Sequence, residues 1–588
     1  MLLRKNFSFL FVFISLYACK GSGKGIDNDI PLFGNIDEAR LSSDISETLN
    51  LLPDSTFPDL DKVRTYYSST AYMAEWVYPE SNIYKLDTLL MHLSNSDEHG
   101  IQQQVLNVDT LALYTQKLKN NDLTYSEIAF LDIAANEAFV RYCKAMRFGL
   151  LTPKDILPNY YFETETADSS FVAQCFADKR TGINNLLNGI QPKNKQYKAL
   201  QNERQKYLLL VDSAFAPIPL FKDKETIKPG DAHPNLPFIA KRLQISGELS
   251  PNYPANMNTK TLDHEIFRAI NRFRKKTGQN IDNEIGNSTI RALNYTFADY
   301  VNKIDINLER LRWNPLRPLG TKYIRVNVAD MSLNAYSGDT IALNMKVCVG
   351  KAPDNKTPFL RSNIHQLVLN PTWSIPKSIV VKETSKLAAR DSSYLRRHNI
   401  RVYRNGTEVH PPKTEWAKIT EHYQPYTLVQ DSGDINALGR IKFNFANKFS
   451  VYLHDTNSKS AFLRHNRALS HGCVRVQKPM ELAFFCLPDY DKTNKQKKEN
   501  RELLQDKIRY TTGKSPLSKT GKETLSETPD KMKTASIQLN QPIPILIDYL
   551  TCYNSAEGVI FRDDIYNLDS CILTNIRKKY PYNNLIFY

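Results

Sequence analysis

The spacing of apolar residues divides the chain into a helical first half and a β-rich second half. Between residues 61 and 230, apolar side chains recur every three or four positions, as in "YSEIAFLDIAANEAFVRYCKAM" and "YKALQNERQKYLLLV". This spacing predicts amphipathic helices, and both stretches consist mainly of residues that favour helix. Because they carry no cluster of reactive side chains, we expect residues 61–230 to form a helical scaffold domain.

A second, smaller helical unit is predicted at residues 231–300. "LPFIAKRLQI" and "LDHEIFRAINRFRKKTG" give two amphipathic helices, and a third follows the turn at "IDNEIGN". The residues alone indicate a small three-helix subdomain. The succession of two helices, "FRKKTG" and "IDNEIGNSTIRALN" resembles the peptidoglycan-binding modules attached to many wall enzymes, which leaves wall binding as an open alternative.

From residue 320 onward the apolar residues alternate with polar ones. "KYIRVNVADMSLNAYSGDTIALNMKVCVG" and "FSVYLHDT" are examples, and this period of two predicts β-strands at residues 320–490. Residues 374–430 interrupt the pattern and are expected to form a helical capping insertion over the sheet. Residues 491–536 are rich in charged side chains, and this composition predicts a polar mobile insertion. Strands return at 537–575, so the whole chain is expected to be a multidomain α+β protein.

The first residues have the composition of an export signal. Two basic residues precede a short apolar run that ends in "LYAC" at Cys19, so residues 1–18 are predicted to be a signal peptide. The run is too short to span a bilayer comfortably. "LYAC" resembles a bacterial lipobox, in which Cys19 is acylated; an ordinary cleaved signal is the alternative. Residues 19–60 are then expected to be a tether, and the protein to lie in the periplasm or cell envelope, lipid-anchored to the membrane.

The net charge indicates what kind of partner the protein binds, and the cysteine spacing bears on metals and cofactors. The formal net charge of +15 favours an anionic partner. The chain has no basic groove-reading helix and no aromatic–basic platform motif, so a carboxylate-rich polymer or a membrane surface is expected rather than nucleic acid. The eight cysteines include no Cys-x-x-Cys pair and no zinc-site spacing, so neither a metal nor a cofactor is predicted. Without Cys19 an odd number remains, and at least one thiol is unpaired.

The sequence "SHGC", Ser470 to Cys473, is the candidate catalytic motif. A nucleophilic cysteine needs a lowered thiol pKa, a nearby base and donors for an oxyanion. Gly472 permits close approach of the backbone, and the amides of Gly472 and Cys473 are candidate donors. His454 ends the strand "VYLHDT" and fifteen residues separate it from Ser470, so the intervening loop is long enough to return the thiol to the imidazole. Taken singly, a buried cysteine is usually inert.

"VYLHDT" followed by "SHGCVRV" resembles the signature of L,D-transpeptidases of the YkuD type. The surrounding sequence resembles the large branch of that family, which carries a helical scaffold, a peptidoglycan-binding module and a capping insertion. The resemblance implies that Cys473 attacks the carbonyl between the third residue of a tetrapeptide stem and its terminal D-alanine, forming a thioester. It implies that His454 accepts the thiol proton and later protonates the leaving amine, that the amides of Gly472 and Cys473 hold the oxyanion, and that His471 assists or fixes the loop.

The same resemblance implies that the amine of a second stem peptide resolves the thioester into a 3→3 crosslink. Arg475 is either a carboxylate contact or a strut of the loop, and Tyr452 and Trp373 are candidates for lining the substrate groove. Asp455 stands where many relatives have Gly; if its backbone carbonyl orients His454, its side chain matters little.

Two alternatives keep the acyl-enzyme and change the acceptor. Transfer to water makes an L,D-carboxypeptidase, and transfer to a protein amine makes a wall-anchoring transpeptidase. A third alternative is a non-catalytic wall-binding lipoprotein. It would be expected to lack Cys473 or His454, and both are present.

Overall fold

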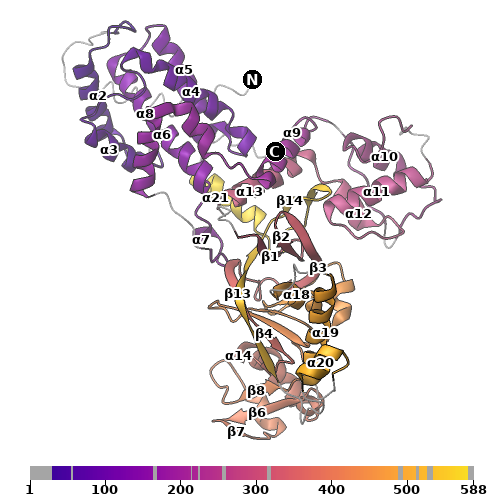
Figure 1. Ribbon diagram of the computed structural model, residues 1–588. Coiled ribbons are helices and arrows are strands. Elements are labelled where there is room, and N and C mark those ends of the chain that lie inside the picture. Colours follow the sequence, from indigo (N-terminus) through magenta and orange to yellow (C-terminus); the bar gives the residue numbers. More distant parts are fainter. Residues whose placement is uncertain are drawn as a thin grey trace.

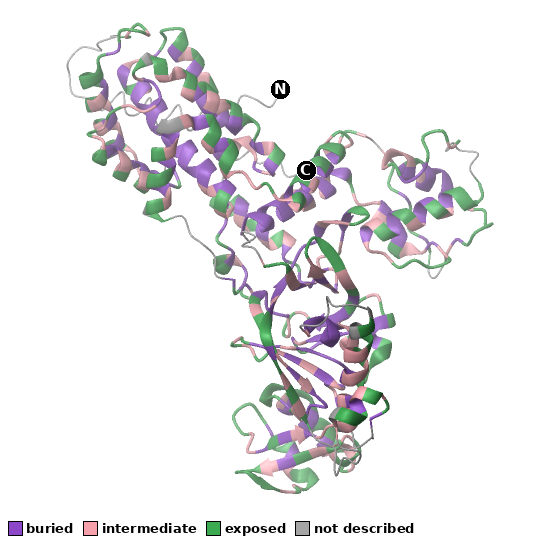
Figure 2. Cartoon of the chain, in the orientation of Figure 1, coloured by how far each residue is buried: buried purple, intermediate pink, exposed green. Residues whose placement is uncertain are grey.

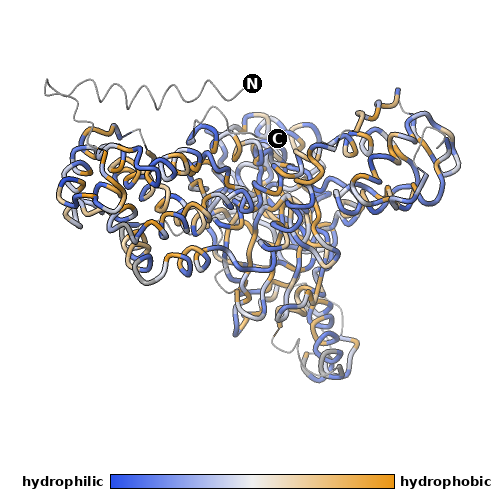
Figure 3. Tube along the Cα trace, turned by 90° about the horizontal axis from the view of Figure 1, so that it is seen from above, coloured by the Kyte–Doolittle hydropathy of each residue, from blue (hydrophilic) through white to orange (hydrophobic). Residues whose placement is uncertain are grey.

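The computed structural model describes residues 30–54, 57–162, 168–213, 215–222, 225–254, 260–313, 319–487, 494–511, 516–525 and 534–580. The predicted signal peptide and Cys19 lie outside these residues. A helical domain and a small helical module flank a β-rich body that ends in a separate lobe (Figure 1). Seen from above, the scaffold and the module extend to opposite sides of that body (Figure 3). Within the described ranges, no helix has the length and apolar character needed to cross a membrane.

The scaffold domain is built around one long buried helix, α6 (Tyr125–Phe148). It begins at a capping box, in which the side chains of Thr124 and Glu127 accept hydrogen bonds from each other's backbone amides. Most of its residues are buried, because other helices pack around it (Figure 2). The remaining scaffold elements are α2 (Glu38–Leu51), α3 (Leu60–Ser69), η1 (Glu80–Asn82), α4 (Ile83–Ser94), η2 (Ser96–His99), η3 (Gln103–Leu106), α5 (Val108–Lys119), α7 (Pro153–Ile156), α8 (Ser169–Ile190) and α9 (Lys195–Leu208).

The prediction that residues 19–60 form a tether is wrong for the part that forms helix α2. The Asp37 carboxylate caps the helix, and α2 packs on α6. Leu41, Ile45 and Leu49 follow each other at four-residue steps and are buried on one face. The second half of the predicted tether is therefore part of the scaffold core.

The small module forms its own core from three helices. Ile218, Phe221 and Ile227 also belong to this core, and Ile227 pairs with Ile285 through two backbone hydrogen bonds of 3.0 and 2.8 Å. The predicted boundary at residue 230 is therefore wrong, since the module begins near Ile218. Its helices are α10 (Leu236–Ile245), α11 (His264–Thr277) and α12 (Asn287–Leu293).

The β-rich domain is one mixed sheet. Among the described residues nine strands pair in the order β11-β3-β12-β10-β9-β4-β13-β1-β2, and β2 pairs with β3 as well, so the order returns on itself. Strand β13 comes from the late part of the chain and lies between β4 and β1. The strands are β1 (Lys322–Asn327), β2 (Ser332–Ser337), β3 (Thr340–Gly350), β4 (Leu360–Leu369), β9 (Ile441–Phe445), β10 (Leu453–His454), β11 (Ala468–Ser470), β12 (Val474–Val476) and β13 (Ala535–Asp548).

The capping insertion is not purely helical, as the sequence predicted, but a small α+β lobe. Four short strands pair in the order β5-β8-β6-β7. Val380, Trp416 and Leu428 are buried in a core separate from that of the main sheet. Its elements are β5 (Trp373–Ser374), α14 (Lys377–Ile379), the π-helix η4 (Val380–Thr384), α15 (Ser385–Arg390), α16 (Tyr394–Arg397), β6 (Ile400–Arg404), β7 (Thr407–Glu408), α17 (Lys413–Ala417) and β8 (Thr427–Gln430).

Part of the predicted mobile insertion at 491–536 is helical. Asp506 on the first of two helices accepts hydrogen bonds from the amides of Leu517 and Ser518, both at 2.8 Å, and so fixes the start of the second. The two helices are α19 (Asn494–Thr511) and α20 (Lys519–Thr524). They follow α18 (Pro479–Cys486), which comes after the candidate motif and strand β12; η5 (Lys459–Leu463) precedes that motif.

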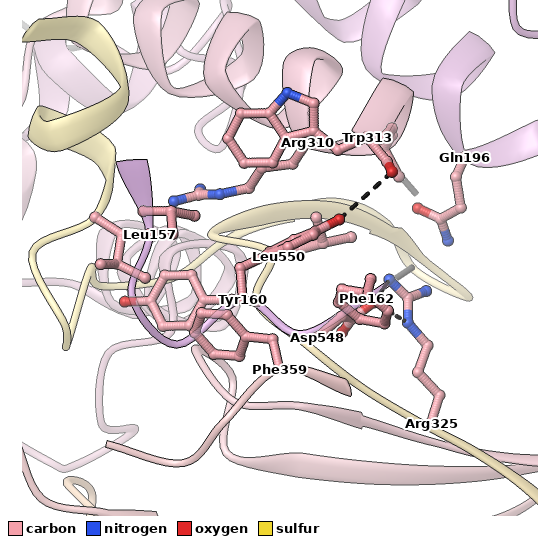
Figure 4. A pocket seen from close by; sticks show the side chains of 13 residues that line it. Leu157, Tyr160, Phe162, Gln196, Arg310, Trp313, Arg325, Phe359, Asp548 and Leu550 are labelled. Carbon is pink, nitrogen blue, oxygen red and sulfur yellow. Dashed lines mark hydrogen bonds and ion pairs between the residues drawn. The ribbon is translucent and has the colours of Figure 1, made fainter. Parts of the chain in front are cut away.

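Helix α13 (Phe297–Trp313) and the last helix, α21 (Asp569–Lys579), join the scaffold to the sheet. Arg310 of α13 forms an ion pair of 2.6 Å with Asp569 of α21, and α13 packs along α9. A cavity of about 40 Å³ remains between α13, the segment that follows α7 (Pro153–Ile156) and the sheet; Figure 4 shows Tyr160 and Phe359 on its wall. The hairpin of β14 (Cys552–Ser555) and β15 (Gly558–Phe561) packs against α9, α13 and α11.

Candidate active site

Strand register places His454 beside Arg475. In the parallel ladder of β10 and β12, Leu453 pairs with Val474 and His454 with Arg475. Leu453 and Val474 are fully buried in the core of the sheet. Because successive side chains of a strand point to opposite faces, His454 and Arg475 lie on the other face. Lys442 of β9 pairs with His454 from the opposite side and shares that face.

Cys473 and Tyr452 directly precede these two strands and lie next to each other. The amide of Val474 donates to the carbonyl of Tyr452 at 3.2 Å. Both the backbone amide and the hydroxyl of Tyr452 hydrogen-bond to the Cys473 thiol, and Sγ lies 3.9 Å from the carbonyl oxygen of Ser450. Trp373 of the capping insertion hydrogen-bonds to the Tyr452 hydroxyl. The structure therefore brings the predicted nucleophile, base and groove residues together on one face.

His454 is held as a neutral base. The ring is buried, and its Nδ1 faces the carbonyl oxygen of Asp455. A carbonyl accepts only, so Nδ1 carries the proton and Nε2 keeps its lone pair. Burial, and then the charge of Arg475, lower the pKa of His454 from 6.5 to about 3. The imidazole is therefore uncharged at neutral pH.

The thiol of Cys473 has a raised pKa, which contradicts the lowered value expected from the sequence. Burial is the largest cause. The hydrogen bonds from Tyr452 and the charges of Lys442 and Arg475 lower the pKa but do not outweigh burial. The resting site is therefore a neutral thiol beside a neutral imidazole, not a thiolate–imidazolium pair.

The "SHGC" turn is organised by Ser470. Its hydroxyl donates to the carbonyl of Cys473 and accepts from the amide of Gly472 at 3.2 Å. Gly472 has a φ of +116°, which favours glycine. The Gly472 amide donates to Ser470 and is not free to bind an oxyanion, so only the Cys473 amide remains of the two donors that the sequence predicted. The Cys473 amide has no hydrogen-bond acceptor among the residues that the structure describes.

A buried clamp on this turn was missed by sequence reasoning. The Thr357 hydroxyl donates to the carbonyl of Gly472 and accepts from the amide of Gly350, both at 2.9 Å. The Tyr566 hydroxyl donates to the Gly350 carbonyl at 2.7 Å and accepts from the Thr357 amide at 3.0 Å. The nucleophile's turn is thus tied to the end of β3 and to the last part of the chain. No local pattern marks either residue.

His471 links the turn to the capping insertion. Its Nε2 lies 2.6 Å from Oε1 of Glu383, and both side chains are partly exposed. His471 therefore points to the cap rather than to Cys473, which favours a loop-fixing role over direct assistance. Glu383 was not predicted from the sequence.

Two cationic side chains, Arg475 and Lys442, lie on the same face of the sheet as His454. The Nε atom of Arg475 is buried and has no hydrogen-bond partner within the described part of the chain. The ammonium of Lys442 lies 4.0 Å from the ring centre of Tyr452, and burial lowers its pKa. Sequence reasoning missed Lys442, although the alternation in "IKFNF" places it opposite the buried Ile441 and Phe443.

The Asp455 side chain makes several contacts, whereas the sequence suggested that it matters little. Its carbonyl does face His454 as anticipated. In addition, its carboxylate accepts from the amides of Arg440 at 2.8 Å and Thr456 at 2.7 Å and pairs with Lys459. The residue that orients the base is thus itself fixed on three sides.

Comparisons with known proteins identify two matching families and several similar proteins. The L,D-transpeptidase catalytic domain model YkuD matches residues 321–495, and a scaffold domain model matches residues 61–203. A putative L,D-transpeptidase of Haemophilus influenzae is 29% identical over 273 residues, which cover 46% of this chain and 49% of that protein. The chain thus matches about half the length of this relative. The crystal structure of an L,D-transpeptidase from Xylanimonas cellulosilytica (residues 123–326) covers 56% of this chain and 99% of that one, at 11% identity. Its TM-score of 0.17 is too low to indicate a common fold.

Proposed function

By its catalytic domain the chain belongs to the YkuD-type L,D-transpeptidases, which are acyl-transferring enzymes, and we propose that it forms 3→3 crosslinks between peptidoglycan stem peptides. The observation that carries the proposal is the pairing of His454 with Arg475 on one face of two adjacent strands, with Cys473 directly before the second of them. An intact nucleophile and base argue against the non-catalytic alternative.

In the first step Cys473 is acylated by the donor stem. The thiol and the imidazole are both neutral at rest, so proton transfer from Sγ to Nε2 of His454 accompanies attack on the carbonyl. A C–S bond forms as the carbonyl becomes an oxyanion. The Cys473 amide and the Arg475 guanidinium are the donors we assign to that charge.

Collapse of this intermediate breaks the C–N bond to D-alanine. The proton held by His454 passes to the leaving nitrogen, and a thioester to Cys473 remains. In the second step the side-chain amine of another stem gives a proton to His454 and attacks the thioester. The C–N bond of the crosslink forms, the C–S bond breaks, and the proton on His454 passes to Sγ, which restores the thiol.

The capping insertion has a direct part in this proposal. Trp373 and Glu383 reach Tyr452 and His471 from the cap, so the lobe covers the nucleophile's turn. Covering the thioester limits its hydrolysis and favours the amine acceptor. If water nevertheless reached it, the protein would act as the L,D-carboxypeptidase named above.

Product analysis tests the proposal. Tetrapeptide-bearing muropeptides are incubated with the protein, and the products are identified by mass spectrometry. Crosslinked dimers that have lost D-alanine support transpeptidation, whereas tripeptides alone indicate the carboxypeptidase and no product contradicts both. Cys473→Ala is the matched control, and a purified wall-associated protein added as acceptor tests the anchoring alternative.

We further propose that the protein is exported and held at the membrane through an acylated Cys19. The support is the signal-like sequence and the net positive charge. Cys19→Ala should move the protein from the membrane fraction to the soluble fraction; unchanged fractionation contradicts the anchor. The module with helices α10 to α12 is proposed to bind the wall, and sedimentation of the protein with and without it on purified wall polymer is the test.

A further inference from the structure

A pocket of about 580 Å³ lies where the scaffold meets the catalytic sheet, and neither Cys473, His454 nor Arg475 lines it. Its walls come from the segment around α7, from the first residues of β4 and from the turn between β9 and β10. The side chains that matter for its chemistry are Lys154, Tyr161, Arg361, Asn447, Lys448 and Phe449.

The walls of the pocket are fixed by hydrogen bonds. Tyr160 pairs with Phe359 as a short parallel bridge, and the amide of Tyr161 donates to the Phe359 carbonyl at 2.9 Å. The opposite wall is fixed by Asn447, whose side chain accepts from the amides of Phe449 and Val451, both at 3.0 Å. Figure 4 shows Tyr160 and Phe359 from the neighbouring cavity. The pocket is therefore preformed.

The lining is basic and aromatic. Lys154, Arg361 and Lys448 are exposed, and no Asp or Glu stands among the described residues that line the pocket. The rings of Tyr161 and Phe449 lie 4.0 Å apart, and the ammonium of Lys448 is 4.9 Å from the Tyr161 ring centre. Such a surface suits a ligand that carries carboxylates on an apolar or sugar body.

The pocket also adjoins the nucleophile. Phe449 is followed by Ser450, whose carbonyl oxygen lies 3.9 Å from Sγ of Cys473. One residue spans under 4 Å, so the pocket wall begins within roughly 10 Å of the reacting sulfur. Ser450, between the pocket wall and Cys473, has a φ of +55°, an uncommon conformation for a residue other than glycine.

We propose that this pocket binds a carboxylate-bearing peptide part of the wall polymer that continues from the acyl-donor stem. This inference rests on the proposed function, because it extends the substrate of the same site. The basic lining attracts the carboxylates, and Tyr161 and Phe449 contact the body of the chain.

Binding is measured with Cys473→Ala, which cannot turn the ligand over. The probe is a tetrapeptide-bearing muropeptide, and a second probe is the same compound with its carboxylates converted to carboxamides. Lys154→Glu/Lys448→Glu should weaken binding of the first probe about three- to tenfold, since two attractions become repulsions. The second probe should bind weakly, and its affinity should not fall further in the double variant. Thermal unfolding checks that the variant folds.

Lys193→Glu/Lys198→Glu is the matched control, because it changes the same charge at exposed lysines outside the pocket. Equal weakening by both double variants, or none by the first, overturns the proposal. Failure of the proposed function is seen separately: wild-type protein that forms no carbapenem adduct on Cys473 is not an acyl-transferring enzyme, whatever the pocket binds.

Discussion

Replacing Thr357 by Val should detach the nucleophile's turn from the rest of the domain. The two side chains are similar in size, so the change removes the hydroxyl without opening a large cavity. Thr357 is fully buried, and its hydroxyl bridges the Gly472 carbonyl and the Gly350 amide. The variant leaves both backbone groups buried without a partner.

The magnitude follows from these two lost bonds. A buried polar group that loses its partner costs about 1–3 kcal/mol, so we expect Thr357→Val, which leaves two such groups, to lower the free energy of unfolding by about 2–6 kcal/mol. The freed Gly472 also loosens Cys473, and a misplacement of about 1 Å reduces a rate by roughly 100-fold at most. We expect acylation of Cys473 to slow about 10- to 100-fold.

Urea unfolding gives the stability, and the rate of carbapenem adduct formation on Cys473 gives the reactivity. Thr357→Ser keeps the hydroxyl and loses one methyl group, worth about 0.8 kcal/mol, and serves as the control. If Thr357→Val reacts as fast as Thr357→Ser, the clamp does not position the nucleophile and the reasoning is wrong.

Other predictions concern charge and the cap. Burial raises the pKa of Cys473, so the ultraviolet thiolate band that Cys473→Ala lacks should be absent at neutral pH and grow only in alkaline solution. Folding lowers the pKa of His454 from 6.5 to about 3. Below pH 6.5 the unfolded chain therefore takes up a proton that the folded protein does not, so the free energy of unfolding falls between pH 6.5 and pH 3. Over that range wild type should lose about 4 kcal/mol more than His454→Asn, as measured by urea unfolding. Glu383→Gln weakens the bond to His471, so stability should change by under ~1 kcal/mol while tripeptide increases relative to crosslinked dimer. Gly350→Ala should not yield a stable fold on thermal unfolding, because a Cβ there would lie 1.7 Å from a backbone oxygen.

The catalytic face could be predicted because its signals are local. "VYLHDT" and "CVRV" alternate around buried Leu453 and Val474, so the face of His454 and Arg475 is set once the strands pair. The α+β class follows from the same change of period from helix to strand. Helix α2 also had a local signal, in the four-residue steps from Leu41 to Leu49.

The missed features depend on tertiary structure. Thr357 and Gly472 are 115 residues apart, and Thr357 and Tyr566 are 209 apart, so no pattern connects them. The strands of the capping lobe are two to five residues long, too short for alternation to be recognised. The sign of the Cys473 pKa shift was also beyond the sequence, since it depends on how deeply the folded chain buries the sulfur.

The central claim is that Cys473 carries the acyl group, and the intact mass of the protein tests it most directly. After brief exposure to a tetrapeptide-bearing muropeptide or a carbapenem, wild type should gain one acyl group, located by peptide mapping on Cys473. Cys473→Ala should gain none. An adduct on another residue, or equal labelling of the variant, would contradict the account.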